Sequence, residues 1–514
     1  MDDAREFAAD LLAGRRTSID DRVARGPGDD PRSTDAILND VRTSIDELDA
    51  QRQRAPAEAL EVFRELLSDP SLVDEDLKTF IDVWRLACTD PPEFRRRVQQ
   101  PPERGPADWW NNLRAFLHRP SSPDDALKKK IDALKTKYRL PAHALGPRVN
   151  PHERLFETLD PAWVPLLGAK LAESKWPKGL VEMPRHRPAQ TFTYEATSGD
   201  APLAGDQPHT VGLMSDFGTG YYHSWGIAEQ LAAWAFPYVF HLGDVYYAGR
   251  PEEFTKRFEL PLFDVVERSQ FLGLAENHEL YDGGAAYLKY FEKLRKRGRT
   301  PQEGSYFCVR FPHHQIIGLD VNWQGRCRFQ DPEVRSWLEQ RLLEGGNRTN
   351  ILLTGNAPFI HGKSGSKKLL DDLRPFLDSS AIGLWFWGDD HYCALFDKRP
   401  PAVPFYGSCI GHAGYPGSRQ KERRPTFKTE PLWLEDQARF PKASEFRDDM
   451  TNNGWCQMTL RPDGGVDLLY VDWLWCKRAA VSFDRDGKGL RLSGPVQEFE
   501  RDNSPQLHLP PGTH

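Results

Sequence analysis

The chain has 514 residues, of which 39 % are hydrophobic and 28 % are charged, and its formal net charge is −7. This composition is typical of a globular protein with a substantial core, and the length predicts about two or three domains. The negative charge argues against a nucleic-acid-binding protein, because no strong positive field attracts a phosphate backbone.

The sequence predicts a cytoplasmic protein that does not contact the membrane. Its first residues, MDDAREFAADLLAGRR, lack the basic and then apolar order of a secretory signal. No apolar run approaches the about 20 residues of a membrane span. The seven cysteines are odd in number and have no CxxC spacing, which favours reduced thiols.

Residues 1–185 are expected to form a charged, mostly α-helical region. Apolar residues recur at helical spacing in PAEALEVFRELL and in EDLKTFIDVWRLAC. The pairs Pro91-Pro92 and Pro101-Pro102 interrupt this pattern. The region has no recognisable catalytic motif, and we expect its helices to be the candidate surface for a protein partner. An interaction protein whose function lies in these helices is therefore an open alternative.

Residues 205–475 change to a pattern in which short apolar runs alternate with amphipathic helices. Two such helices are expected in HSWGIAEQLAAWAF and DPEVRSWLEQRLLEG. Short runs of this kind are typical of strands that are buried on both faces of a sheet, so the segment is predicted to be an α/β domain. The apolar runs are TVGLMS, YVFHLG, QFLGLA, HQIIGLD, NILLTG and IGLWFWG.

The last part of the chain is predicted to be β-structure. The stretch NNGWCQMTLRPDGGVDLLYVDWLW has the pattern of a hairpin that turns at Asp463-Gly464-Gly465. Residues 476–514 are expected to add a C-terminal β extension and a tail. The final SPQLHLPPGTH is expected to be a loose terminus.

Polar side chains follow five of the apolar runs, at the point where each predicted strand ends. One aspartate after a strand is usually a helix cap or a turn residue. Five successive strands with such ends instead predict a metal site, because ligands of open α/β sheets bind at this edge and oxygen and nitrogen donors suit hard or borderline metals. The residues are Asp216; Asp244; Asn277, His278 and Glu279; Asn356; and Asp389, Asp390 and His391.

The order of the motifs SDFG, GDVYYAG, ENHEL and GDDH resembles that of the calcineurin-like metallophosphoesterases, over about residues 205–475. The resemblance implies a layered β-sandwich flanked by helices, here preceded by the helical N-terminal region. It also implies a metal-dependent phosphoesterase in which a metal-activated hydroxide attacks a phosphate ester. The implied cofactor is a divalent or mixed-valence metal pair, with Fe, Mn or Mg favoured and Zn or Ca as further candidates.

The first metal position resembles that of the purple acid phosphatase branch of the family. The first motif lacks the common histidine, and the branch replaces it with a tyrosine three residues after the second aspartate, a spacing that Asp244 and Tyr247 have. The resemblance therefore implies Asp216, Asp244, Tyr247 and His391 as ligands of the first ion. The alternative is that Tyr247 only packs beside Tyr246.

The second metal position departs from the family pattern at three residues. Asn356 and Asp389 stand where the family has histidines, and Glu276 replaces the usual glycine before Asn277. In one interpretation the site survives with oxygen donors from Asp244, Asn277, Asn356 and Asp389, which suit Mg²⁺, Mn²⁺ or Ca²⁺ better than Zn²⁺. In the other interpretation the site is lost, and the chain is a catalytically silent protein that binds a phosphorylated ligand or a protein partner.

The family resemblance implies that His278 is the general acid, which protonates the leaving oxygen. Glu279 is either a residue that orients His278 or a carboxylate at a helix start. The expected substrate is a phosphorylated small molecule or a phosphoprotein, and the sequence does not distinguish between them.

Overall fold

The structure is a computed structural model of the chain. The residues that it describes are 133, 135–140, 180–199, 201–220, 222–246, 249–281, 283–323, 327–358, 367–377, 382–400, 403–415, 431–435, 452–500 and 505–511. The helices predicted within residues 56–67 and 75–88 therefore lie outside the described residues. None of the described helices is long and apolar enough to cross a membrane.

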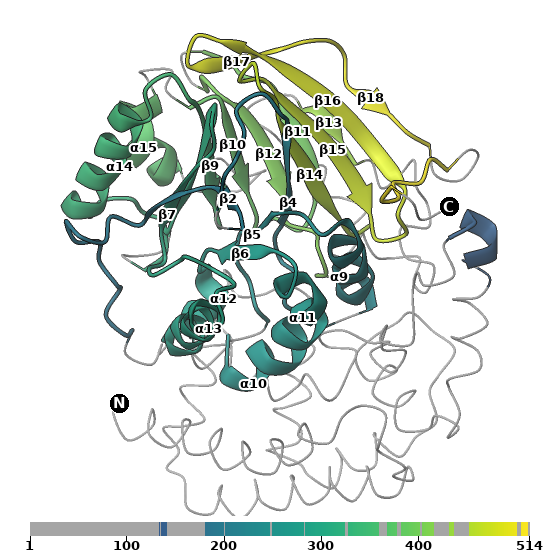
Figure 1. Cartoon of the computed structure of the whole chain (residues 1–514), viewed down its shortest axis with the longest axis horizontal. Helices are drawn as coiled ribbons and strands as arrows, with labels where there is room; N and C mark the ends of the chain where they lie inside the picture. Colours follow the sequence, from purple (N-terminus) through teal and green to yellow (C-terminus); the bar gives the residue numbers. More distant parts are fainter. Residues whose placement is uncertain are drawn as a thin grey trace, which may run out of the picture. The chain divides into compact units, whose positions relative to one another are not determined.

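The described strands form two sheets of eight strands each and one short two-stranded pair (Figure 1). The first sheet has the order β1 (Thr193–Glu195), β7 (Phe307–Arg310), β8 (His314–Leu319), β9 (Thr349–Thr354), β10 (Leu384–Trp387), β12 (Tyr406–Ile410), β11 (Cys393–Phe396) and β13 (Pro431–Leu434). The second has the order β17 (Gly489–Leu492), β16 (Lys477–Asp486), β15 (Val466–Asp472), β14 (Gly454–Leu460), β4 (His209–Met214), β5 (Tyr238–His241) and β6 (Gln270–Gly273), and β18 (Gln497–Glu498) pairs with β16. The short pair is β2 (Thr197–Ser198) and β3 (Ala201–Pro202).

Each sheet contains a run of parallel strands. In the second sheet β4, β5 and β6 are parallel neighbours. In the first sheet β8, β9, β10 and β12 are parallel neighbours. The carboxyl ends within each run therefore point to the same edge of its sheet, which is where α/β sheets bind ligands.

The hydrophobic core lies between the two sheets. Leu213 and Phe240 from the second sheet share one buried cluster with Ile351 and Phe386 from the first. Side chains also meet across the sheets, for example Tyr406 and Phe483, whose ring centroids are 4.7 Å apart. Burial of such side chains is worth about 1.5–3 kcal/mol each, so this interface fixes the strand ends that carry the polar residues.

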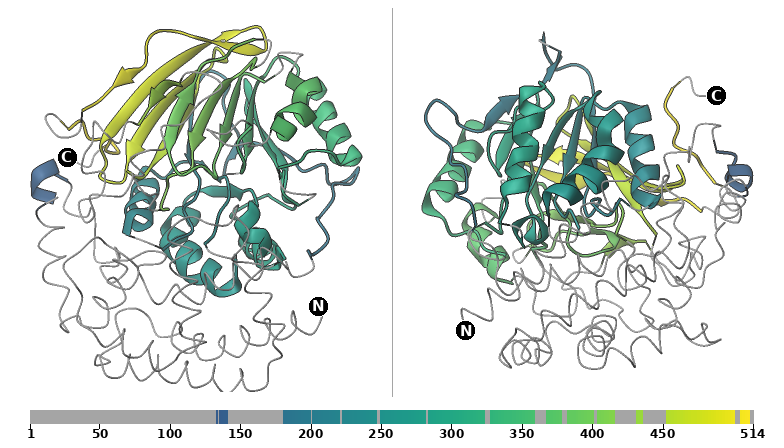
Figure 2. Two further views of the ribbon diagram at one scale, coloured as in Figure 1. Left: turned by 180° about the vertical axis from the view of Figure 1, so that it is seen from behind. Right: turned by 90° about the horizontal axis from the view of Figure 1, so that it is seen from below.

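Helices flank the two sheets (Figures 1 and 2). The helices beside β4–β6 lie near the ends of these strands, and α14 and α15 lie beside the first sheet near β9. The α14 helix begins with a clear signal, since the Asp331 side chain accepts hydrogen bonds from the backbone N–H groups of Glu333 and Val334 and Pro332 follows it. The bounds are α9 (Tyr222–Trp234), α10 (Pro251–Glu253), the π-helix η4 (Phe254–Glu259), α11 (Leu260–Val266), α12 (Asn277–Tyr281), α13 (Ala285–Lys296), α14 (Pro332–Glu344) and α15 (Lys367–Leu377).

The predicted layered α/β fold is confirmed. Each of the six apolar runs contains a strand, and the predicted hairpin is the pair β14–β15. The expectation of a loose terminus is wrong for residues 505–511, because this segment is tied to the loop that follows β15. The backbone of His508 donates to Trp475 O at 2.8 Å, and its ring stacks on that of Trp234 with centroids 4.2 Å apart.

Candidate metal centre

The predicted site residues lie at the carboxyl ends of parallel strands from both sheets. The second sheet provides Asp216 after β4, Asp244 after β5, and Glu276, Asn277 and His278 after β6; the first provides Asn356 after β9 and Asp389 and His391 after β10. A hydrogen bond joins the two sets, because the backbone N–H of Asp389 donates to Asp216 Oδ2 at 3.1 Å. The two sheet edges therefore meet at one place.

Three of the aspartates have a left-handed backbone conformation. The φ angles are 59° at Asp216, 75° at Asp244 and 63° at Asp389. Aspartate tolerates this region better than most residues, but holding a side chain there costs about 1–3 kcal/mol, and such strain gathers at functional sites. Close packing accompanies it, since a Cβ atom added to Gly388 would lie 2.7 Å from Asp216 Oδ2. We infer that the turns are shaped to direct carboxylates into the site.

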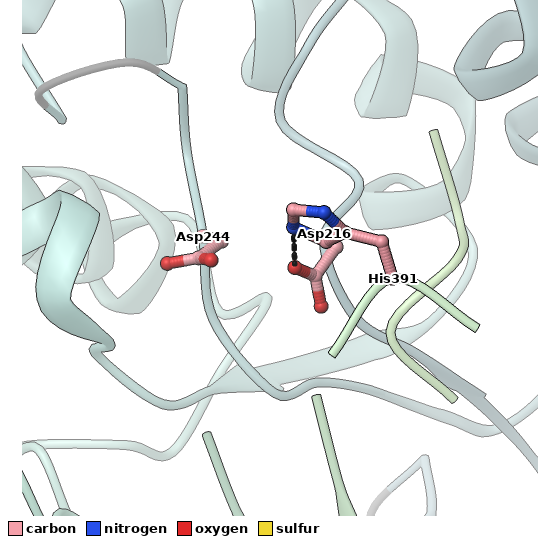
Figure 3. A group of neighbouring side chains, drawn as sticks. All are labelled: Asp216, Asp244 and His391. Atoms are coloured by element: carbon pink, nitrogen blue, oxygen red, sulfur yellow. Dashed lines mark ion pairs between the residues drawn. The ribbon is translucent and has the colours of Figure 1, made fainter. Parts of the chain in front are cut away.

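The first group of side chains is Asp216, Asp244 and His391 (Figure 3). One ligand atom from each lies within 4.8 Å of the others, and His391 Nε2 is 3.3 Å from Asp216 Oδ1. The His391 ring stacks on Tyr415, with centroids 3.6 Å apart. Two carboxylates and an imidazole suit a borderline metal ion such as Fe²⁺, Mn²⁺ or Zn²⁺.

The hydroxyl of Tyr246 lies among these three side chains. It donates to Asp216 Oδ1 at 2.5 Å, contacts Asp244 Oδ2 at 3.0 Å and is 3.1 Å from His391 Nε2. The sequence predicts Tyr247, which lies outside the described residues, so that ligand stays a prediction. Tyr246 was not predicted as a site residue, and its place beside Tyr247 in the same motif was the available signal.

The second group is Asp244, Glu276 and Asp389, again with one ligand atom from each within 4.8 Å of the others. Asp244 belongs to both groups. Glu276, which the sequence argument treated only as a departure from the family pattern, is buried with 1 % of its surface exposed. A carboxylate shared by two ligand groups can bridge a pair of cations.

The two predicted asparagine ligands differ in their surroundings. Asn356 Nδ2 donates to Asp389 Oδ2 at 2.8 Å, so the structure brings Asn356 to the second group. The amide of Asn277 is instead hydrogen-bonded to the Tyr281 hydroxyl, 2.6 Å away. The orientation that satisfies both ends of this amide has its oxygen accepting from Tyr281 and its nitrogen facing Glu276.

His278, the predicted general acid, lies beside Asp244, the carboxylate that both groups share. Its Nε2 is 4.0 Å from Asp244 Oδ2, and its ring packs edge-on against Tyr246 with centroids 4.4 Å apart. Glu279 Oε2 accepts a hydrogen bond from the backbone of Glu276 at 2.8 Å. Burial raises the pKa of Glu279 to about 7.

The carboxylates influence one another strongly. Burial raises the pKa of Asp244 well above its usual value, and the charges of neighbouring carboxylates, first Glu276 and then Asp216, raise it further. Burial also raises the pKa of Asp216, but hydrogen bonding and charge from His391 overcome it and hold that pKa at about 2. Concentrated buried negative charge of this kind is stabilised by cations.

Comparison with known proteins places the centre in a family. Residues 209–393 match the family model described as calcineurin-like phosphoesterase. This segment is a calcineurin-like phosphoesterase domain. It contains all the residues of both groups, and its bounds lie inside the predicted 205–475. No curated protein matches the chain in a sequence search.

Three solved structures are similar to this chain. A purple acid phosphatase from yellow lupin (Lupinus luteus) is 13 % identical with a TM-score of 0.41, and the match covers 53 % of this chain and 53 % of the lupin chain. GAP50 of Plasmodium, described as the anchor in the inner membrane complex, is 11 % identical with a TM-score of 0.38 and coverage of 57 % and 90 %. A dimetal phosphatase from Danio rerio is 11 % identical with a TM-score of 0.33 and coverage of 51 % and 95 %. The match thus spans about half the length of the lupin protein.

A buried ion pair joins the end of β13 in the first sheet to β16 in the second. Glu435 Oε1 accepts from Arg478 Nε at 2.9 Å and from Asn452 Nδ2 at 2.7 Å, and Glu435 Oε2 is 3.7 Å from His412 Nε2. Burial raises the pKa of Glu435, but Arg478 and His412 outweigh it and hold the pKa below its usual value. The pair therefore stabilises the fold above the ordinary glutamate pKa, and this contribution is lost as the pH falls through the lowered value.

We expect Glu435→Leu to lower the free energy of unfolding at pH 7 by about 3–5 kcal/mol, because it leaves the Arg478 charge buried without its carboxylate. Urea denaturation measures the loss. The control is Glu292→Ala, which removes an exposed pair with Lys296 and should change the stability little. Equal stability of the Glu435→Leu variant and the parent would show that the buried pair does not stabilise the fold.

Proposed function

We propose that this chain is a metal-dependent phosphoesterase that hydrolyses a phosphate ester. The single observation that carries the proposal is Asp244, whose carboxylate belongs to both ligand groups of a calcineurin-like phosphoesterase domain. The first group supplies Asp216 and His391, and the second supplies Asp389 with Asn356 beside it. These donors fit two cations that share one carboxylate.

Two bound cations would supply Lewis-acid stabilisation of the phosphoryl oxygens and a water of lowered pKa as the nucleophile. The side chains of this chain hold and orient the groups around them. Tyr246 supports Asp216 and Asp244 by hydrogen bonds, and Tyr415 fixes the ring of His391 by stacking. A nucleophile placed by such fixed ligands gains from proximity and orientation.

His278 is proposed to be the proton donor. Its ring nitrogen faces Asp244 at 4.0 Å, so it lies beside the position where the phosphoryl group would be held. In this role Nε2 gives its proton to the oxygen of the leaving group as the phosphorus–oxygen bond breaks. A positioned general acid contributes about 10²–10⁴-fold to a rate.

The substrate is proposed to be a phosphorylated small molecule or a phosphoprotein rather than a nucleic acid, in keeping with the net charge of −7. The N-terminal region of residues 1–185 is proposed to bind a protein partner, and the compartment is proposed to be the cytoplasm. A pull-down with residues 1–185 alone, compared with the full chain, tests the proposed role of that region.

Removal of metal is expected to abolish hydrolysis of an aryl phosphate by the full chain. Protein treated with a chelator and dialysed should be inactive, because a hydroxide among these carboxylates is stabilised only when cations are bound. Activity should return with at least one of Fe²⁺, Mn²⁺, Mg²⁺, Zn²⁺ or Ca²⁺. The measurement is release of the phenol, with elemental analysis of the same samples.

Two outcomes would contradict the proposal. Full activity in metal-free protein would exclude the metal-dependent mechanism. Stoichiometric metal binding without turnover of any aryl phosphate would favour a catalytically silent protein that binds a phosphorylated ligand at the same metal centre.

A further inference from the structure

Glu276 occupies a prepared position between the turns that carry the other ligands. Its stem is so close to two glycines that a Cβ atom added to Gly243 would lie 2.5 Å from Glu276 Cβ, and one added to Gly355 would lie 2.4 Å from Glu276 Cγ. Gly243 precedes Asp244 and Gly355 precedes Asn356. The glutamate is therefore inserted between the β5 and β9 turns and is not a surface substitution.

The Glu276 carboxylate is also oriented by hydrogen bonds. Oε1 accepts from Asn322 Nδ2 at 3.0 Å, and Oε2 accepts from the backbone N–H of Asn277. Asn322 is itself fixed, because its backbone N–H donates to Asp320 Oδ1 at 2.9 Å. Such partners fix the direction of a ligand and tune its affinity for a metal.

Buried oxygen atoms beside this carboxylate lack hydrogen-bond donors. Among the described residues, Asp244 Oδ1 and Asn356 Oδ1 have no hydrogen-bond partner, and each residue has only 1 % of its surface exposed. Asn356 is anchored to Asp389 through its nitrogen, so its side chain is directed into the second group. A buried polar atom without a partner is costly, and an ion that accepts oxygen lone pairs removes this cost.

We propose that the second cation position is an all-oxygen site in which Glu276 is a ligand together with Asp244 and Asp389, and that it takes a hard divalent cation, Mg²⁺, Mn²⁺ or Ca²⁺. The Asn356 oxygen completes the set. The proposal rests on the metal-binding half of the proposed function and does not require turnover.

The donor set decides the class of ion. The site contains three carboxylates and an amide oxygen, with no nitrogen or sulfur donor in the second group. Zn²⁺ sites in proteins are built mainly from cysteine and histidine, whereas Mg²⁺, Mn²⁺ and Ca²⁺ prefer carboxylate and carbonyl oxygens. The Asn277 amide is hydrogen-bonded to Tyr281 in this structure, so Glu276 and not Asn277 provides the further oxygen donor, with a negative charge, at the second position.

Counting of bound Mn²⁺ tests the proposal without any substrate. Metal-free full chain is titrated with Mn²⁺, and the free ion is measured from its electron paramagnetic resonance signal. We expect two equivalents bound to the parent protein and one to Glu276→Gln, which keeps the size of the side chain and one acceptor oxygen but removes its charge. The matched control is Asp472→Asn, which neutralises a buried carboxylate outside both groups, keeps an oxygen for the backbone N–H groups of Leu474 and Cys476, and should still bind two.

Glu276→Asp provides a second variant that keeps the charge and shortens the reach. It should bind two equivalents, with the affinity of one lowered by at least about 100-fold, since even changes at residues that only support a ligand cost about 10–100-fold. Two equivalents of unchanged affinity in either Glu276 variant would overturn the proposal, as would a single equivalent in the parent. If the Mn²⁺ counts are as expected but no phosphate ester is hydrolysed, the metal site is supported and the proposed phosphoesterase activity is contradicted. If a phosphate ester is hydrolysed but the counts do not depend on Glu276, the activity is supported and the metal site is contradicted.

Discussion

Asp244→Asn is expected to lower the turnover of an aryl phosphate by about 10³-fold, because several kcal/mol of metal-based stabilisation are lost and each 1.36 kcal/mol is a factor of ten in rate. Asp244 is the residue that both ligand groups share. Asparagine keeps the size of the side chain and an oxygen that can accept the hydrogen bond of Tyr246. The change therefore removes charge from both cation positions with little change in packing.

The same substitution is expected to stabilise the metal-free protein. Burial and neighbouring carboxylates raise the pKa of Asp244 in the folded state. A carboxyl group with a raised folded pKa opposes folding once the pH exceeds its unfolded pKa, so at pH 7 a neutral amide removes an unfavourable contribution. Activity and thermal stability should thus change in opposite directions.

Steady-state kinetics with added Mn²⁺ and the melting temperature of chelator-treated protein measure these two effects. Asp472→Asn is again the matched control, because Asp472 is a buried carboxylate that belongs to neither ligand group. It should keep most of the activity. A metal-free Asp244→Asn protein that melts below the parent, or that hydrolyses the substrate at the parental rate, would show that Asp244 is a structural residue.

The sequence was sufficient to predict the sheets and the edge that carries the polar residues. Parallel strands buried on both faces are short apolar runs, and β9 (Thr349–Thr354) is buried at every position. Ligands of α/β sheets bind at the carboxyl ends of such strands, so a carboxylate that recurs at these ends is informative. Asp216, Asp244, Asp389 and His391 were placed together on this argument, and the structure brings them together.

The details that the sequence could not provide are those set by side-chain direction. Tyr246 is one of two adjacent tyrosines, and the motif spacing did not indicate that its hydroxyl enters the first group. Glu276 was identified as a departure, but its contact with the second group depends on space left by glycines in two distant turns. Contacts between turns far apart in the chain are not encoded in local spacing.

His278→Ala is expected to lower kcat for an alkyl phosphate by about 10²–10⁴-fold while leaving the metal content unchanged, because the residue is proposed to move a proton and belongs to neither ligand group. Elemental analysis separates this variant from Asp244→Asn, which should lose metal. The rate should recover in part when imidazole is added to the His278→Ala protein, since a small general acid can enter the space left by the ring.

The leaving group provides the sharper test of the proton-transfer role. A nitrophenolate departs without protonation, whereas an alkoxide needs a proton as the phosphorus–oxygen bond breaks, so the loss in His278→Ala should be small for nitrophenyl phosphate and large for an alkyl phosphate. A residue that only positions the phosphate would affect both substrates equally. Equal losses for both leaving groups would therefore assign His278 to substrate positioning, and an unchanged rate for both would remove it from the site.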